Sequence, residues 1–149
     1  MIIIDGHNLL FQRKDEFKPN IETEIDRQTK LISSLCPNKK VILVYDGTGG
    51  GLSEHGFEKN VSKTTRIVYS GKHRNADNWI VNYISIHPQE MISLITNDLG
   101  LRNRTKVKRV KHFNCLDWFN KISDTKKISK RNKNEFGSQE YWEDYFSEN

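Results

Sequence analysis

Short apolar runs alternate with amphipathic stretches along most of this chain. The runs are rich in Ile and Val, as strands buried on both faces are, and they cover 2–4, 41–45, 67–69, 91–96 and, more weakly, 107–110. Between them, apolar residues recur at helical spacing over 21–35, 80–84 and 113–122, and a short helix is expected after Asp98. The alternation indicates right-handed βαβ units. It therefore predicts an α/β fold, a three-layer sandwich around a mostly parallel sheet of about five strands.

Four aspartates follow the predicted strands. Asp5, Asp46 and Asp98 come soon after apolar runs, and Asp77 follows the run 67–69 after a loop. Because the carboxyl ends of parallel strands face one crevice, the four carboxylates are expected to converge. Like charges in a partly desolvated cleft are stabilised by a hard divalent cation, which prefers oxygen ligands. The pattern predicts a site for Mg²⁺ or Mn²⁺.

Each aspartate also has a purely structural interpretation. Asp77 and Asp98 would then be helix N-caps, while Asp5 and Asp46 would stabilise tight turns beside the glycines that follow them. Independent capping would scatter acidic residues over both ends of the sheet. The occurrence of all four at strand exits on one side favours a functional site.

Other polar residues lie close to these aspartates in the sequence. Asn8 and Asn97 add neutral oxygen and amide groups near the predicted strand ends. His7 has three interpretations: it orients a carboxylate, it contacts substrate, or it is a buried core histidine. His73 and Arg74, which precede Asp77, either contact phosphate or are solvated.

An excess of positive charge predicts a polyanionic partner, of which nucleic acid is the natural candidate. The chain has 24 Lys and Arg against 19 Asp and Glu, a formal net charge of +5. The basic residues near Asp98 are Arg102, Arg104, Lys106, Lys108, Arg109 and Lys111. They either hold nucleic-acid phosphates beside the metal or form one exposed face of an edge strand, and the two interpretations are compatible.

Two segments interrupt the alternation of strands and helices. Residues 46–65 begin with a glycine-rich run and predict a flexible loop, either a phosphate cradle or a surface linker. From Asp124 the chain is charged and ends in Tyr141, Trp142, Tyr145 and Phe146, which predicts a disordered or docking tail. The expected organisation is one catalytic domain over 1–123 and a tail over 124–149.

The sequence has neither the pattern of a secretory leader nor an apolar stretch approaching the roughly 20 residues of a membrane span. These observations predict a cytoplasmic protein without a membrane partner. Cys36 and Cys115 fall in no spacing typical of a metal site or a disulfide.

Four motifs in order resemble those of the NYN/PIN-like ribonucleases, most closely the YacP-like branch. They run over about residues 2–120 and are Ile4 to Leu10, Val44 to Gly47 with the glycines after it, Tyr69-Ser70 with Asn75 to Ile80, and Ile95 to Asp98 followed by Leu101-Arg102. YacP-like proteins often have a second acid where this chain has Asn78, and an aromatic residue where it has His7. One fewer negative charge would weaken occupancy of a second cation.

The resemblance implies a PIN-like fold and endonucleolytic cleavage of RNA that depends on Mg²⁺ or Mn²⁺. Carried over by position, Asp5, Asp77 and Asp98 are the metal-binding carboxylates, and Asn8 and Asp46 support the site. Arg74, Arg102, Arg104 and Lys106 are the residues expected to bind RNA.

The function expected on these grounds is that of an endoribonuclease in which water activated by the cation attacks the phosphodiester. The main alternative is a catalytically inactive RNA-binding or ribosome-binding module with the same fold. A third alternative is a metal-dependent phosphatase or a flap-type DNA nuclease, because the same carboxylate chemistry acts on any phosphodiester.

Overall fold

A six-stranded sheet forms the centre of the computed structural model, which describes residues 1–13 and 20–131. The strands are β1 (Ile2–Asp5), β2 (Val41–Tyr45), β3 (Phe57–Asn60), β4 (Thr65–Tyr69), β5 (Ile92–Ile95) and β6 (Val110–Phe113). Their order is β3-β4-β2-β1-β5-β6, and every neighbouring pair is parallel except β3 and β4. The predicted parallel α/β sheet is confirmed, with one antiparallel strand added at its edge.

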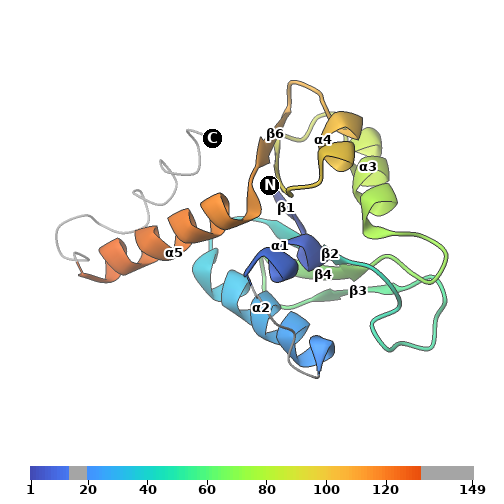
Figure 1. The fold of residues 1–149 in the computed structure, drawn as a ribbon, viewed down its shortest axis with the longest axis horizontal. Helices are drawn as coiled ribbons and strands as arrows, with labels where there is room; N and C mark the ends of the chain where they lie inside the picture. Colours follow the sequence, from blue (N-terminus) through green and yellow to red (C-terminus); the bar gives the residue numbers. More distant parts are fainter. Residues whose placement is uncertain (14–19, 132–149) are drawn as a thin grey trace.

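Five helices cover the two faces of this sheet (Figure 1). They are α1 (Gly6–Arg13), α2 (Ile21–Leu35), α3 (Ala76–Ile86), α4 (Leu99–Arg104) and α5 (Cys115–Arg131). Helices α1, α2 and α5 bury apolar residues on one face, and α3 and α4 do so on the other. The fold is thus the predicted three-layer sandwich.

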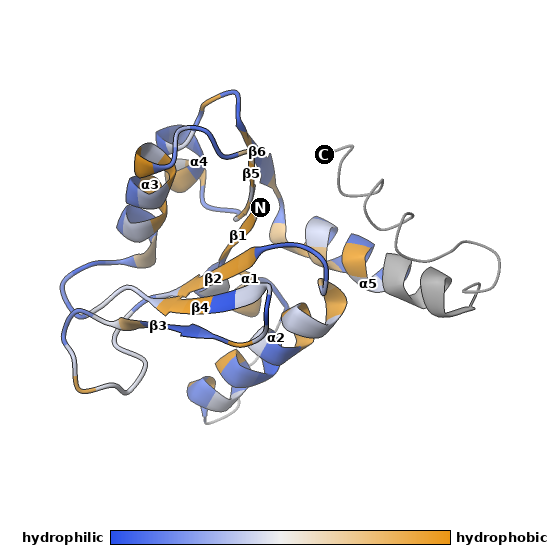
Figure 2. Ribbon diagram, turned by 180° about the vertical axis from the view of Figure 1, so that it is seen from behind, coloured by the Kyte–Doolittle hydropathy of each residue, from blue (hydrophilic) through white to orange (hydrophobic). Residues whose placement is uncertain are grey.

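Alternation along the strands produces the two cores. Ile2 and Ile4 of β1 pack toward α1, α2 and α5, whereas Ile3 packs toward α3 and α4. Successive side chains of a strand point to opposite faces, so a strand covered on both sides must be apolar throughout. Figure 2 shows this in the hydrophobic colour of β1 and β2 and the largely hydrophilic colour of the edge strand β3.

Several element boundaries differ from the sequence prediction. Helix α1 was not predicted because it follows β1 without a linker, and β3 was not predicted because all four of its residues are exposed. The last strand covers 110–113 instead of 107–110, since Val107 is 48% exposed and only Val110 enters the core. The last helix accordingly begins at Cys115 and not at residue 113.

The prediction for the two helix caps is half right. The Asp98 side chain accepts a hydrogen bond from the Leu101 N–H and caps α4 as expected. Helix α3 is capped instead by Asn75, whose side chain accepts from the Asn78 N–H, so Asp77 lies within its first turn. The Asp77 carboxylate is therefore not engaged in capping.

Helix α5 runs across residue 124, where the tail was predicted to begin. The aromatic residues of that tail, from Tyr141 to Phe146, lie outside the described residues. Within the described ranges, no helix is both long and apolar enough to cross a membrane.

Candidate active site at the carboxyl ends of the strands

The four aspartates lie at the carboxyl ends of four adjacent strands. Asp5 is the last residue of β1 and Asp46 directly follows β2, while Asp98 begins α4 after β5. Asp77 lies in the first turn of α3, which follows β4. Burial raises the pKa values of Asp5 and Asp77, and neighbouring carboxylates add to the rise: Asp77 and Asp46 act on Asp5, and Asp98 and Asp46 act on Asp77. The carboxylates therefore converge as their sequence positions predict.

Asp5 is the most buried of the four, with 7% of its surface exposed. Burial raises the pKa of its carboxyl to about 7, and the neighbouring charges of Asp77 and Asp46 add to the effect. The Thr96 hydroxyl opposes the rise by donating a 3.0 Å hydrogen bond to Asp5 Oδ2. The same hydroxyl accepts from the Asp98 N–H at 3.1 Å, so Thr96 connects two of the carboxylate positions.

Asn8 and Asn97 connect the cluster to α5. Asn8 Oδ1 accepts from the Asn97 N–H at 2.8 Å and from the Cys115 thiol at 3.2 Å. Asn97 Oδ1 accepts from the Cys115 N–H at 2.8 Å. Both side-chain oxygens are thus occupied by protein donors, and these amides position the ends of β1 and β5.

Asp46 connects two elements beside the cluster. Its Oδ1 accepts from the Ala76 N–H, 2.6 Å away at the N-terminus of α3. His7 Nδ1 accepts from the Asp46 N–H at 3.1 Å and lies 3.7 Å from Asp46 Oδ2. Since Nδ1 accepts, His7 is neutral in this geometry, and burial lowers its pKa although Asp46 opposes that change. Of the three interpretations of His7, orienting an aspartate matches these contacts.

Asp77 faces Asp98 across the cluster. Burial raises the pKa of Asp77, and the negative charges of Asp98 and Asp46 add to the rise. Arg104 opposes the rise through its positive charge.

Comparison with known proteins identifies the family of this chain. A family model described as the YacP-like NYN domain matches residues 2–149. The chain belongs to this family. No curated protein matches the sequence.

Solved structures share its fold. Rae1 (YacP) from Bacillus subtilis is 15% identical with a TM-score of 0.68, over 99% of this chain and 88% of its own. The structure of its W164L mutant is 14% identical with a TM-score of 0.67, over 87% of this chain and 78% of the mutant chain. The T5 D15 protein, co-crystallized with metal ions, is 13% identical with a TM-score of 0.50, over 76% of this chain and 54% of its own. At such identities the likeness establishes the fold alone, which is that of the PIN-like nucleases.

Asn78 is bound by two arginines. Arg104 donates to Asn78 Oδ1 at 2.8 Å, and Arg74 donates to the Asn78 carbonyl at 3.4 Å. An aspartate at this position would pair with Arg104. Its charge would be partly neutralised and would strengthen cation binding less than the sequence alone suggests.

The oxygen donors of the cluster fit a hard divalent cation in their chemistry. Burial raises the pKa values of Asp5 and Asp77, and the negative charge of the neighbouring aspartates raises them further; a cation would relieve that charge. In the described part of the chain, however, no three His, Cys, Asp or Glu side chains lie close enough together to hold a metal ion. The ligands are therefore of the right chemical kind, but in the described residues they are not gathered closely enough to form a ready site.

The basic residues after Asp98 have different roles. Arg104 and Lys106 are exposed, as the RNA-binding interpretation requires, and the positive charge of Arg104 acts on Asp77. Arg102 is partly buried and donates from Nε to the Thr96 carbonyl at 2.9 Å. Arg109 donates to carbonyls of α3 and the loop that follows it, those of Ile84, His87 and Glu90, so it is not part of a solvated basic face.

The sequence analysis did not single out Thr96. This residue is fully buried, and its hydroxyl bonds both the Asp5 carboxylate and the Asp98 backbone. The available signal was a hydroxyl residue at the end of an apolar run, directly before Asn97 and Asp98. Such a residue must find hydrogen-bond partners when the strand is buried.

Proposed function

We propose that this protein is a metal-dependent endoribonuclease that hydrolyses RNA phosphodiester bonds with Mg²⁺ or Mn²⁺, acting in the cytoplasm. The observation that supports this most is the convergence of Asp5, Asp46, Asp77 and Asp98 at one edge of the sheet. In a chain of the YacP-like NYN family, this edge is where parallel α/β folds place their ligands.

Three of the carboxylates would hold the cation. These are Asp5, Asp77 and Asp98, which come from three separate elements. Asp98 Oδ1 accepts from the Leu101 N–H and Asp46 Oδ1 from the Ala76 N–H, so each of these two would offer its other oxygen. When bound, a divalent cation supplies positive charge to the phosphoryl oxygens and lowers the pKa of water. Asn8, Thr96 and Arg102 position the strand ends from which the carboxylates extend.

The protonation of the cluster is coupled to cation binding. Asp5, with a pKa of about 7, exchanges its proton near neutral pH, and burial with the neighbouring charges also raises the pKa of Asp77. A cation requires ionised ligands, so its binding would release protons, and it would bind more weakly as the pH falls below about 7.

The test is cleavage of a mixed RNA pool followed by mapping of the new ends. We expect internal cuts with Mg²⁺ or Mn²⁺, none with EDTA, and recovery when the metal is added back in excess. Cleavage that persists in EDTA would contradict metal dependence.

One observation favours the alternative of an RNA-binding module without activity. The candidate ligands do not form a ready group of three in the described residues. If RNA binds but is not cut at any concentration of either metal, this module replaces the ribonuclease proposal.

RNA binding by this edge of the sheet would depend on exposed cations. Replacing Arg74, Arg104 and Lys106 together with Gln is expected to weaken RNA binding and to flatten the slope of log affinity against log salt by up to about 2, because fewer counterions are released. Arg102 is left intact, since its Nε holds the Thr96 carbonyl. Fluorescence anisotropy at several salt concentrations measures this slope.

A triple variant of Lys30, Lys59 and Lys121 to Gln is the matched control. All three residues are exposed and lie on other elements, namely α2, β3 and α5. Equal slopes for the two triple variants would show that position does not matter and would exclude a specific RNA path at the cluster.

A further inference from the structure

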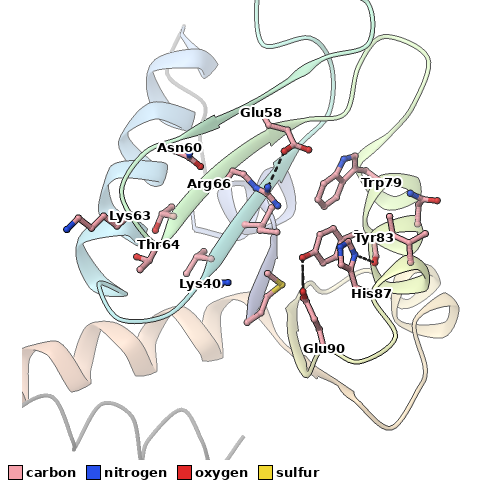
Figure 3. A pocket seen from close by; sticks show the side chains of 16 residues that line it. Lys40, Glu58, Asn60, Lys63, Thr64, Arg66, Trp79, Tyr83, His87 and Glu90 are labelled. Carbon is pink, nitrogen blue, oxygen red and sulfur yellow. Dashed lines mark hydrogen bonds and ion pairs between the residues drawn. The ribbon is translucent and has the colours of Figure 1, made fainter.

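A cavity lies between α3 and the strands β2, β3 and β4, on the face of the sheet covered by α3 (Figure 3). Its volume is about 530 Å³, within the range of small-molecule sites. Residues at the beginning of β2 and β4, among them Val41 and Thr65, line it. The cavity thus opens toward the amino ends of the parallel strands, whereas the aspartate cluster lies at their carboxyl ends.

One wall of this α3 pocket is aromatic. Trp79, Tyr83 and His87 recur every fourth residue, so their rings lie along one face of α3. Trp79 stacks on Tyr83 with ring centroids 5.3 Å apart, and Tyr83 stacks on His87 at 3.9 Å. The Trp79 side chain is partly exposed and ends the stack, so one face of its indole is free of other rings within the described residues.

The opposite wall is charged. Arg66 of β4 and Glu58 of β3 form a 3.3 Å ion pair, and in Figure 3 they face Trp79 and Tyr83 across the cavity. The Tyr83 hydroxyl donates to Glu90 at 3.1 Å. Both carboxylates are therefore already paired with a cation or a hydroxyl.

Two further cations lie at the rim of the pocket. Lys40 and Lys63 are exposed, come from the segments before β2 and β4, and have no ion pair within the described residues. Together with Arg66, these lysines give the pocket three positively charged side chains, against the two negatively charged side chains of Glu58 and Glu90. The pocket is thus suited to an anion attached to a flat, polar ring.

A buried polar atom beside the cavity lacks a partner. Thr65 is 1% exposed and lines the pocket, and its hydroxyl is the one buried side-chain polar atom without a hydrogen bond among the residues described. Buried hydroxyls are normally satisfied, because leaving one unpaired costs free energy. Along β4 the Thr65 side chain points to the same face as that of Ile67, which packs toward α1, α2 and α5, so this unpaired hydroxyl does not point into the α3 pocket.

We propose that the α3 pocket binds a nucleotide. A flat base would lie between the Trp79 indole and the Arg66 guanidinium, since bases stack on aromatic rings and on arginine. The polar groups of Glu58 and Tyr83 lie near the base edges, and the exposed side chains of Lys40 and Lys63 would hold the phosphate, Lys63 after turning inward from the direction that Figure 3 shows. The nucleotide is either free in solution or part of an RNA strand that also reaches the aspartate cluster at the other end of α3.

The experiment measures binding by calorimetry in EDTA at low salt, so that cleavage plays no part. The probes are adenosine monophosphate, guanosine monophosphate and a short oligoribonucleotide. Replacing Lys40 and Lys63 together with Gln is expected to weaken binding about tenfold, because two phosphate contacts are lost. Replacing Trp79 with Leu is expected to weaken it by a similar factor through the loss of stacking.

Lys59→Gln is the matched control, because Lys59 follows Glu58 on β3 and lines a different cavity, beside α2. The lysine variants change only exposed side chains, so they keep the test valid if Trp79→Leu fails to fold. If the pocket variants bind the monophosphates more weakly, the pocket is a site for free nucleotides. If they weaken binding of the oligoribonucleotide alone, the pocket is a site for RNA. Equal affinity of all three variants and the wild type for every probe, or no binding of any probe, would overturn the proposal without bearing on cleavage.

Discussion

Replacing Asp5, Asp77 or Asp98 with Asn is expected to reduce RNA cleavage by about 10³-fold in each case, because a lost ligand charge removes several kcal/mol of transition-state stabilisation. Asn is close to Asp in shape and also serves as a helix cap, so Asp98→Asn should keep α4 intact. Initial rates on a defined RNA at saturating Mg²⁺ measure the effect. Asp26→Asn, which removes an exposed charge from α2, is the matched control and should cleave normally.

The stability of the Asp5 variant distinguishes a lost ligand from a damaged fold. The pKa of Asp5 is raised from 3.8 to about 7 in the folded protein, so the folded state binds a proton more tightly than the unfolded state. Stability of the wild type is therefore lost as the pH rises from about 4 to about 7. Asn does not titrate, so without metal Asp5→Asn should be more stable than the wild type at pH 8, by about 1 to 2 kcal/mol, and the gain should shrink toward pH 4.

Denaturant unfolding in EDTA at several pH values measures this difference. Full cleavage by any two of the three variants would contradict the proposed ligand assignment. A variant that loses both cleavage and stability would indicate structural damage and would not support a role in metal binding.

Gly6→Ala is expected to destabilise the protein by about 3 kcal/mol, which would lower its melting temperature by roughly 10 °C. A Cβ atom at Gly6 would lie 2.4 Å from Cε1 of Tyr45, and the Tyr45 ring is fully buried. The ring has little freedom to move because its hydroxyl accepts from Gln28 Nε2 at 3.0 Å and lies 3.2 Å from the Thr29 hydroxyl. The first turn of α1, which carries His7 and Asn8, would have to shift instead.

Thermal and denaturant unfolding test this expectation. Gly100→Ala is the control, because Gly100 is exposed in α4 and its nearest contact would be the Asp98 side chain at 3.1 Å. Alanine in a helix is favoured over glycine by up to about 1 kcal/mol, so this change should be neutral or slightly stabilising. Similar melting temperatures for Gly6→Ala and the wild type would show that the turn accommodates the methyl group.

The strand-and-helix alternation and the positions of the four aspartates were readable from the sequence. Strands β1 and β2 are continuous apolar runs because both of their faces are covered, and that composition is visible without a structure. Asp5 and Asp46 follow those runs directly. Once the sheet is parallel, its connectivity places their carboxylates at one edge, so chain order alone was sufficient.

Elements that depend on a partner could not be predicted. Strand β3 has four exposed residues, and it is a strand because Phe57 to Asn60 pair with β4. The cap of α3 was assigned to Asp77 although Asn75 provides it, because both residue types cap helices equally well and only the path of the loop decides between them.

The order of apolar runs and aspartates along the chain is therefore sufficient to predict the layers of the fold and which acids gather at one end of the sheet. The role of each polar group there depends on contacts that form only in the folded protein. Thr96 hydrogen-bonds to Asp5, Asn8 to the backbone of Asn97, and Arg104 to Asn78, and the partners are as far as 91 positions apart in the sequence. The physical reason is that apolar periodicity is a local property of the chain, whereas the partner of a buried polar atom depends on which distant segment packs against it.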